Sequence, residues 1–187
     1  FHRGCRALNS HCLFLHNSVT QVHFDPRKSS PYIIGGGAVK FMQVDRGFAY
    51  YCIYKENSNV FEGGAASFHM FLSNYTEVGS LFMDNDSDDL GGAVSFRHIP
   101  QNIHFLSCQF SSNYASASGG AIYGENPEQG GASVLLHIKN VNLIKNRSGR
   151  NGGAICVKYI IHVRIVNCSI LMNVAKQLGG GVFVKGI

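Results

Sequence analysis

The chain has 187 residues, of which 45% are hydrophobic and 14% are charged, and its formal net charge at pH 7 is +5. This length allows one domain with a substantial core. No apolar run approaches the about 20 residues of a membrane-spanning helix, so the sequence predicts no transmembrane segment. The modest charge is scattered, without a stripe of Lys and Arg interleaved with aromatic residues, which argues against a nucleic-acid partner.

Two short motifs appear early in the chain and then recur to its end. The first is FLHN at Phe14–Asn17, an aromatic or aliphatic residue three places before an asparagine. The second is a glycine pair followed by a small residue, which begins at Gly36, Gly63, Gly91, Gly119, Gly152 and Gly179. In the last five units the asparagine precedes the first glycine by six residues each time. Self-similarity at a period near 28 residues predicts a solenoid.

Each repeat offers three short segments with alternating apolar residues, seen in the fourth repeat at residues 94–96, 103–105 and 108–110. Few apolar runs follow the 3.6-residue period of a helix, which disfavours a helical solenoid. We therefore predict an all-β fold, a single-stranded parallel β-helix of about six coils of 27–28 residues with three short strands per coil. The general crossover preference predicts a right-handed coil.

Stacked coils place equivalent residues above one another, so inward columns can be read from the alignment. The first column is Phe14, Tyr54, Phe82, Phe110, Leu143 and Ile170. The second is Cys12, Cys52, Ser80, Cys108, Val141 and Cys168. The third is Val39, Ala66, Val94, Ile122, Ile155 and Val182.

The two motifs are predicted to form the corners of each coil. The asparagines suit a turn, because Asn tolerates left-handed backbone geometry and its amide can bond along the stack. We expect a structural ladder of Asn57, Asn85, Asn113, Asn146 and Asn173. The glycine pairs suit a corner that needs positive φ or close approach to the next coil.

Six cysteines are present, and four occupy the second inward column. Free Cys behaves there as a small hydrophobic residue, so we expect core thiols. Only Cys12 and Cys52 are neighbours in adjacent coils, at a spacing that would permit a disulfide. The cysteines therefore leave the redox compartment open.

The paired motifs GGAI and FxxN resemble those of the chlamydial polymorphic outer membrane proteins, and the resemblance is closest at Phe110–Asn113 and Gly119–Ile122. It spans roughly residues 10 to 187. The resemblance implies a right-handed, pectin-lyase-like β-helix, a structural or adhesive role, and a location at the cell surface or in secreted form.

Residues 1–187 are predicted to form a single β-helix segment, as a fragment of a longer solenoid. Its expected partners are other protein chains or further coils of the same chain. Two insertion loops interrupt the repeats, at residues 18–35 and 125–131. Insertions in solenoids project from one face and often bind partners.

A polysaccharide lyase or glycoside hydrolase is the alternative function, because such enzymes share the β-helix. Their chemistry needs clustered carboxylates on an outward strand face, and the alignment shows no such pair there. We therefore predict a non-enzymatic protein without catalytic residues and without a cofactor. Asp84, Asp86 and Asp88 have the alternate spacing of calcium loops and form a weak metal candidate.

Two outward columns of residues are also candidate surface features. His104 and His137 are expected to stack, with Arg164 next in their column, as a surface feature rather than a metal site. Tyr123, Cys156 and Phe183 follow one another in the outward column beside the glycine pairs. An exposed apolar stripe usually marks an interface, so these three are our partner-binding candidates, unless a loop covers them.

Overall fold

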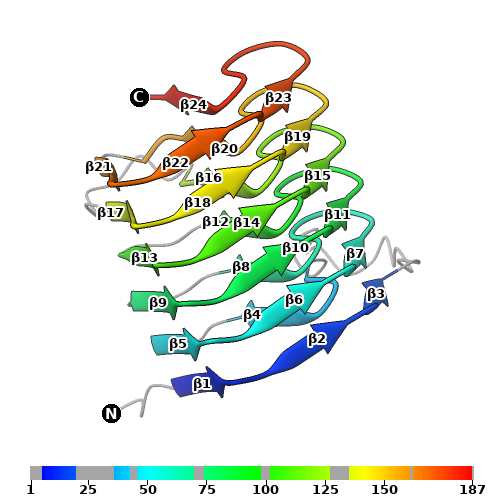
Figure 1. Ribbon diagram of the computed structural model, residues 1–187, viewed down its shortest axis with the longest axis vertical. Helices are drawn as coiled ribbons and strands as arrows, with labels where there is room; N and C mark the ends of the chain where they lie inside the picture. The colour runs from blue at the N-terminus through cyan, green and yellow to red at the C-terminus, as the bar shows by residue number, and fades with distance from the viewer. Residues whose placement is uncertain are drawn as a thin grey trace, which may run out of the picture.

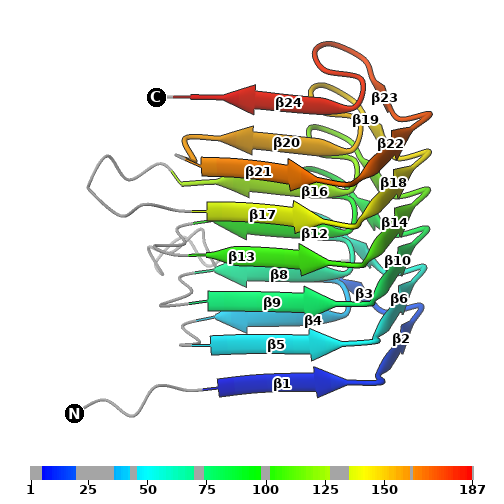
Figure 2. The same ribbon diagram turned by 60° about the vertical axis from the view of Figure 1, so that its left-hand side comes forward.

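The computed structural model of the protein describes residues 6–19, 36–42, 46–69, 74–97, 102–126, 135–160 and 162–186. These residues form 24 strands and no helix. The strands make four parallel sheets of six strands each, and every sheet takes one strand from each repeat. The chain winds upward as a right-handed parallel β-helix (Figures 1 and 2).

We name the sheets A to D in the order in which the chain visits them. Sheet A contains β1 (Arg6–Ser10), β5 (Arg46–Tyr50), β9 (Asn74–Val78), β13 (Ile103–Leu106), β17 (Leu135–Lys139) and β21 (His162–Val166). Sheet B contains β2 (Leu13–Leu15), β6 (Ile53–Lys55), β10 (Leu81–Met83), β14 (Gln109–Ser111), β18 (Asn142–Ile144) and β22 (Ser169–Leu171).

Sheets C and D complete each coil. Sheet C contains β3 (Ser18–Val19), β7 (Ser58–Asn59), β11 (Asp86–Ser87), β15 (Tyr114–Ala115), β19 (Arg147–Ser148) and β23 (Val174–Ala175). Sheet D contains β4 (Val39–Met42), β8 (Ala66–His69), β12 (Val94–Arg97), β16 (Ile122–Glu125), β20 (Ile155–Lys158) and β24 (Val182–Lys185).

The structure corrects the predicted number of strands per coil from three to four. The additional strand is the two-residue strand of sheet C that directly follows each asparagine. The predicted insertion at 18–35 therefore begins later, because Ser18 and Val19 belong to β3. Residues 20–35 of that loop, and residues 127–131 of the loop at 125–131, lie outside the described part of the chain.

The core confirms the three predicted inward columns. Phe82 pairs in register with Tyr54 on one side and with Phe110 on the other. The rings are stacked, with centroids 4.5 Å apart in both pairs and interplanar angles of 5° and 3°. Together with the columns of sheets A and D, they form one apolar core that runs along the rod. This continuous burial is the main stabilising contribution, because no coil can bury its inner face alone.

The asparagine ladder runs between sheets B and C and is fully hydrogen-bonded in the central coils. The side-chain Nδ2 of Asn85 donates to Oδ1 of Asn113 at 2.9 Å and to the carbonyl oxygen of Tyr54 at 3.0 Å. The backbone N–H of Asn85 donates to the same Oδ1 of Asn113 at 3.1 Å. The same pattern repeats from Asn57 to Asn146.

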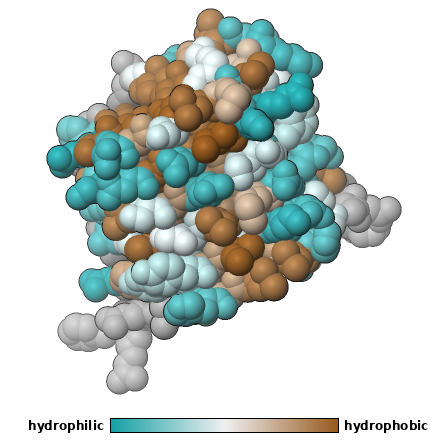
Figure 3. Space-filling view, viewed as in Figure 1, coloured by the Kyte–Doolittle hydropathy of each residue, from teal (hydrophilic) through white to brown (hydrophobic). Residues whose placement is uncertain are grey.

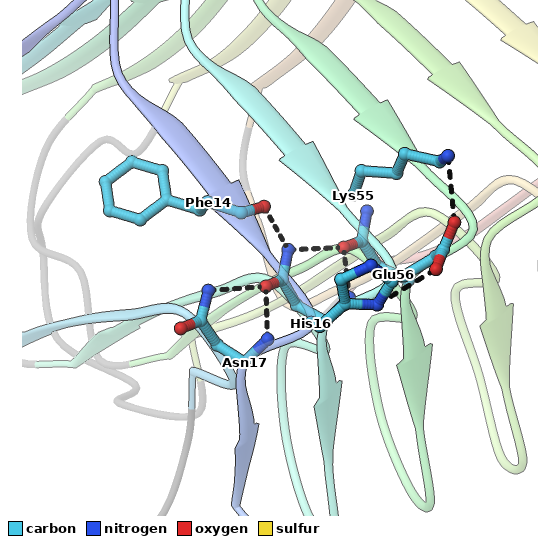
Figure 4. A network of polar contacts seen from close by, with 7 residues as sticks. Phe14, His16, Asn17, Lys55 and Glu56 are labelled. Atoms are coloured by element: carbon cyan, nitrogen blue, oxygen red, sulfur yellow. Dashed lines mark hydrogen bonds and ion pairs between the residues drawn. The ribbon is translucent and has the colours of Figure 1, made fainter.

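Figure 4 shows the N-terminal end of this ladder. Asn17 donates to the next asparagine of the ladder, whose own Nδ2 donates to the carbonyl oxygen of Phe14 at 3.0 Å. Glu56 lies beside the ladder in the exposed turn, where it pairs with Lys55 at 2.9 Å and with His16 at 2.9 Å. Buried amides and exposed ion pairs thus occupy the same corner, and the buried amides hold it together.

The corners differ from the prediction in one detail. The left-handed residue is the one before each asparagine, for example Asp84 at φ 53° and Ser112 at φ 55°, rather than the asparagine itself. The glycine pairs use both properties that we predicted for them. Gly119 has φ 71°, and a Cβ on Gly120 would collide with the carbonyl oxygen of Gly153 in the next coil.

The cysteines of the second column are free thiols, as predicted. Each donates a weak hydrogen bond to the carbonyl oxygen two residues earlier, at 3.5 Å in Cys52 and 3.3 Å in Cys108. Ser80 occupies the same column, and its hydroxyl oxygen accepts a hydrogen bond from the backbone N–H of Cys52 at 3.0 Å. The column therefore accepts small side chains that can satisfy the local backbone.

Candidate functional site

The outer face of sheet D carries the predicted apolar stripe, but the stripe is not exposed. Ser95, Tyr123, Cys156 and Phe183 follow one another in register, as expected. However, Tyr123 is only 1% exposed and Cys156 is 0% exposed. These two residues therefore cannot contact a partner directly, which corrects our prediction for them.

The chain itself covers the stripe. Leu90 and Ala117, from the turns between sheets C and D, pack with Tyr123 and Cys156 in a second apolar cluster. Phe183 packs against this cluster and is only partly buried. The alternative that a loop covers these side chains is thus correct, and turns before the glycine pairs provide the cover.

A charged cluster that the sequence analysis missed lies on the same face. Arg97, at the end of β12, contacts Glu62 from the preceding coil at 2.7 Å and Glu125 from the following coil at 3.4 Å. The other oxygen of Glu62 accepts a hydrogen bond from the hydroxyl of Ser95 at 3.4 Å. The Arg97 guanidinium also lies 5.6 Å from the centre of the Tyr123 ring. One guanidinium therefore ties three successive coils together.

Burial controls the electrostatics of this cluster. Desolvation raises the pKa of Glu62 above its ordinary value, although the charge of Arg97 opposes the rise. Desolvation also raises the pKa of Cys156 to about 11, so its thiol is a poor nucleophile at neutral pH. Both carboxylates of the cluster face the same cation. Both Glu62 and Glu125 are paired with the Arg97 guanidinium, so the arrangement is suited to joining neighbouring coils.

The acidic turn does not gather a metal site. Asp84 lies in the turn between sheets B and C, and Asp86 is the first residue of β11. Burial, followed by repulsion from Asp88, raises the pKa of Asp86. In the part of the chain that the structure describes, no three His, Cys, Asp or Glu side chains are placed to share an ion.

A buried carboxyl group inside the core is the second feature that sequence reasoning missed. Glu77 points inward from β9 and is 0% exposed. Its carboxylate accepts a hydrogen bond from the hydroxyl of Tyr75. Its other oxygen and the hydroxyl of Tyr54 are buried without a hydrogen-bond partner in the described chain. Desolvation raises the pKa of Glu77 to about 7, and the nearby hydroxyls of Ser80 and Tyr75 oppose this rise.

Only the strand alternation could have revealed Glu77. It occupies the inward position that Phe105 and Ile138 take in the next two coils, two residues after an inward aromatic or aliphatic side chain. A carboxylate in an inward column conflicts with the pattern, and such conflicts are where a fold departs from simple packing rules.

The outer faces of sheets A and B are more accessible. On sheet A, His104 pairs in register with His137, and His137 with Arg164, as predicted. The two imidazole rings meet edge to face, with centroids 5.7 Å apart. On sheet B, Leu13, Ile53 and Leu81 follow one another in register at outward positions.

One comparison with known proteins gives a match. The family model of the Chlamydia polymorphic membrane protein repeat matches residues 107–125 and 140–158. Each matched segment contains one asparagine of the ladder and one glycine pair, Asn113 with Gly119 in the first and Asn146 with Gly152 in the second. These two segments, about a fifth of the chain, are similar to polymorphic membrane protein repeats.

The polymorphic membrane protein repeat therefore corresponds to one corner-to-corner unit of the coil, from sheet B through sheet C into sheet D. No curated protein and no solved structure matches the chain significantly. Among the described residues, no helix has the length and apolar character needed to cross a bilayer.

Proposed function

We propose that the chain is a non-enzymatic, structural and adhesive β-helix segment of a surface protein, and that it binds other proteins through the outer face of sheet B. The polymorphic membrane protein repeats support the surface location, because their name refers to membrane proteins. The four continuous sheets support the structural role, since they form a rod that can present side chains at regular intervals.

The outward apolar column of sheet B is the observation that carries this proposal. Leu13, Ile53 and Leu81 lie at equivalent positions of three successive coils. Leu13 is 61% exposed, and the other two are half-buried. Figure 3 shows apolar side chains gathered in patches among polar ones on this face of the molecule. Apolar side chains that remain accessible in a row favour a protein partner.

Phe183 extends the candidate surface on another sheet. It is the member of the predicted stripe that keeps partial exposure, at the outer face of β24. A partner that contacts Phe183 would continue the apolar cluster of Tyr123 and Cys156. We therefore retain Phe183 as a second contact residue. Tyr123 and Cys156 belong to the buried apolar cluster against which Phe183 packs.

Attachment of beads coated with the purified chain to cultured epithelial cells tests the proposal. Leu13→Ser combined with Leu81→Ser should reduce attachment severalfold. The matched control is Gln109→Ser combined with Asn142→Ser, which changes polar residues at equivalent positions of the same column. Equal attachment by all three proteins, at wild-type level, would contradict the proposed face.

A polysaccharide-active enzyme is the second candidate, and one observation favours it. Glu62 and Glu125 flank Arg97 on an outward face, and burial raises the pKa of Glu62, as in many general acids. The test is the release of reducing ends or unsaturated products from polyuronate and neutral glycan chains. We expect no release above that of heat-denatured protein. Turnover that disappears in Glu62→Gln would establish the enzyme instead.

A further inference from the structure

Charge is segregated along the rod rather than scattered, which corrects the expectation from the net charge. All 11 acidic residues lie within residues 1–128, whereas residues 129–187 contain no Asp or Glu. The 16 Lys and Arg residues divide equally, eight before residue 129 and eight after it, so the two parts carry net charges of −3 and +8. The C-terminal cations are Lys139, Lys145, Arg147, Arg150, Lys158, Arg164, Lys176 and Lys185.

Two of these cations, Lys139 and Arg164, lie on the outer face of sheet A together with three histidines. Strand pairing places His104, His137 and Arg164 in one outward column, while Lys139 and His162 lie on the same face of β17 and β21. We call these five residues the cationic strip. Lys139, His162 and Arg164 are exposed. The strip crosses three neighbouring strands near the C-terminal end of the rod (Figure 2).

No carboxylate balances the strip within the described structure. Glu77 is the one acidic residue in the described strands of sheet A, and it points inward. Arg97 and Lys55, in contrast, are paired with carboxylates on other faces. The described salt bridges include neither Lys139 nor Arg164. Positive charge on this face is therefore available for an external anion.

The positive charge on this face affects the pKa of His137. Burial lowers the pKa of His137, and the nearby charges of Arg164 and Lys139 lower it further. Burial also lowers the pKa of His104, with a contribution from His137. A bound anion would reverse the electrostatic part of the His137 shift, because opposite charge favours the protonated ring.

We propose that the cationic strip binds an acidic polysaccharide, with sulfate or carboxylate groups held by Arg164 and Lys139. Arg and Lys donate charge-assisted hydrogen bonds to such anions. Lys139 and Arg164 lie on neighbouring strands, offset by two residues along the open sheet face, and strands in a sheet are about 4.8 Å apart. This spacing lets an extended polymer that lies across the coils reach both cations. The outward positions of β13, β17 and β21 hold no Phe, Tyr or Trp on which bases could stack, and this disfavours single-stranded nucleic acid.

Binding to immobilised heparin tests this inference, measured at about 150 mM salt and again at high salt. Arg164→Ala combined with Lys139→Ala should weaken binding about tenfold. The matched control is Arg147→Ala combined with Lys176→Ala, which removes one exposed Arg and one exposed Lys elsewhere in the same two coils. The control should change the affinity less than about twofold. Equal losses in both variants, or no loss in the first, would overturn the assignment.

Two further measurements make the result specific. Heparin should raise the pKa of His137, followed by NMR of the imidazole ring, and it should not do so in the Arg164 and Lys139 double variant. Desulfated heparin, anionic lipid vesicles and duplex DNA are the competing probes. Tighter binding of vesicles or DNA than of heparin by the wild-type chain would contradict a polysaccharide partner.

This inference deepens the proposed adhesive function but can fail separately from it. Enzymatic removal of sulfated polysaccharide from the cell surface should reduce attachment of coated beads if the strip is used in adhesion. Attachment that survives this treatment, together with absent heparin binding, would reject the strip and leave the sheet B proposal standing. Heparin binding without any cell attachment would reject the adhesive role and keep the strip.

Discussion

At the scale of single residues, Glu77 should make stability depend on pH. Its pKa in the folded protein is about 7, above the ordinary value of 4.5, so the folded state holds this proton more tightly than the unfolded chain. The stabilisation is fully present below about pH 4.5 and is lost as the pH rises toward 7. The difference between the two pKa values corresponds to about 3 kcal/mol.

Glu77→Gln should remove this pH dependence, because glutamine keeps the shape and the hydrogen bond from Tyr75 without titrating. The measurement is the free energy of unfolding in urea at pH 5 and pH 8 for both proteins. His104 and His137 have lowered pKa values and act in the opposite direction, so the difference between variant and wild type is the quantity to compare. An identical pH profile in the two proteins would show that Glu77 is not buried as described.

Asn113 is the second residue whose removal should be costly. Its side chain accepts hydrogen bonds from Asn85 and donates to Asn146 and to the carbonyl oxygen of Phe82, all within the buried corner. Asn113→Ala leaves these groups unpaired and should lower the free energy of unfolding by about 1 to 3 kcal/mol. Asn142→Ala, at an exposed position of β18, is the control and should cost less than about 0.5 kcal/mol.

At the scale of the element, Phe110 tests the aromatic column of sheet B. It stacks on Phe82 at 4.5 Å and meets Phe105 edge to face at 5.5 Å. Phe110→Ala should cost about 3 to 5 kcal/mol, because it opens a cavity between two coils. Phe110→Leu should cost about 1 kcal/mol, since Leu143 already occupies the same column one coil later. Equal stability of the Ala and Leu variants in a denaturant titration would refute this packing.

The elements also show which parts of the fold the sequence could predict and why it could not predict the others. Columns such as Phe82 and Phe110 were predictable, because a fixed period aligns them and burial requires them to be apolar. The strands of sheet C were not, since two residues carry no periodicity. The site was harder still: Glu62 lies in a turn 35 residues before Arg97, so only the stacking of coils brings them together. Tyr123 was predicted to be exposed, because the alternation of apolar and polar residues along a strand does not reveal a turn that folds back and covers the sheet.

At the scale of the whole molecule, the fold is a stack of equivalent coils in which each coil contacts its neighbours. Sheets, aromatic columns and asparagine ladder all use the same register from one coil to the next. Such a stack tolerates the loss of a complete unit, because the remaining coils close on each other with the same contacts. It does not tolerate the loss of half a unit, which puts every later residue on the wrong sheet.

Deletion of residues 85–112 tests this account most directly. The deletion removes one 28-residue period and joins Asp84 to Asn113, which restores the motif FMDN and lets Phe82 stack on Leu143. We expect a soluble protein with the β-sheet circular dichroism of the wild type and cooperative unfolding in urea. Its m-value should fall by about a sixth, in proportion to the surface buried. Deletion of residues 85–98, half a period, should leave an unfolded or aggregated chain. If the two deletions behave alike, the chain is not a stack of interchangeable coils.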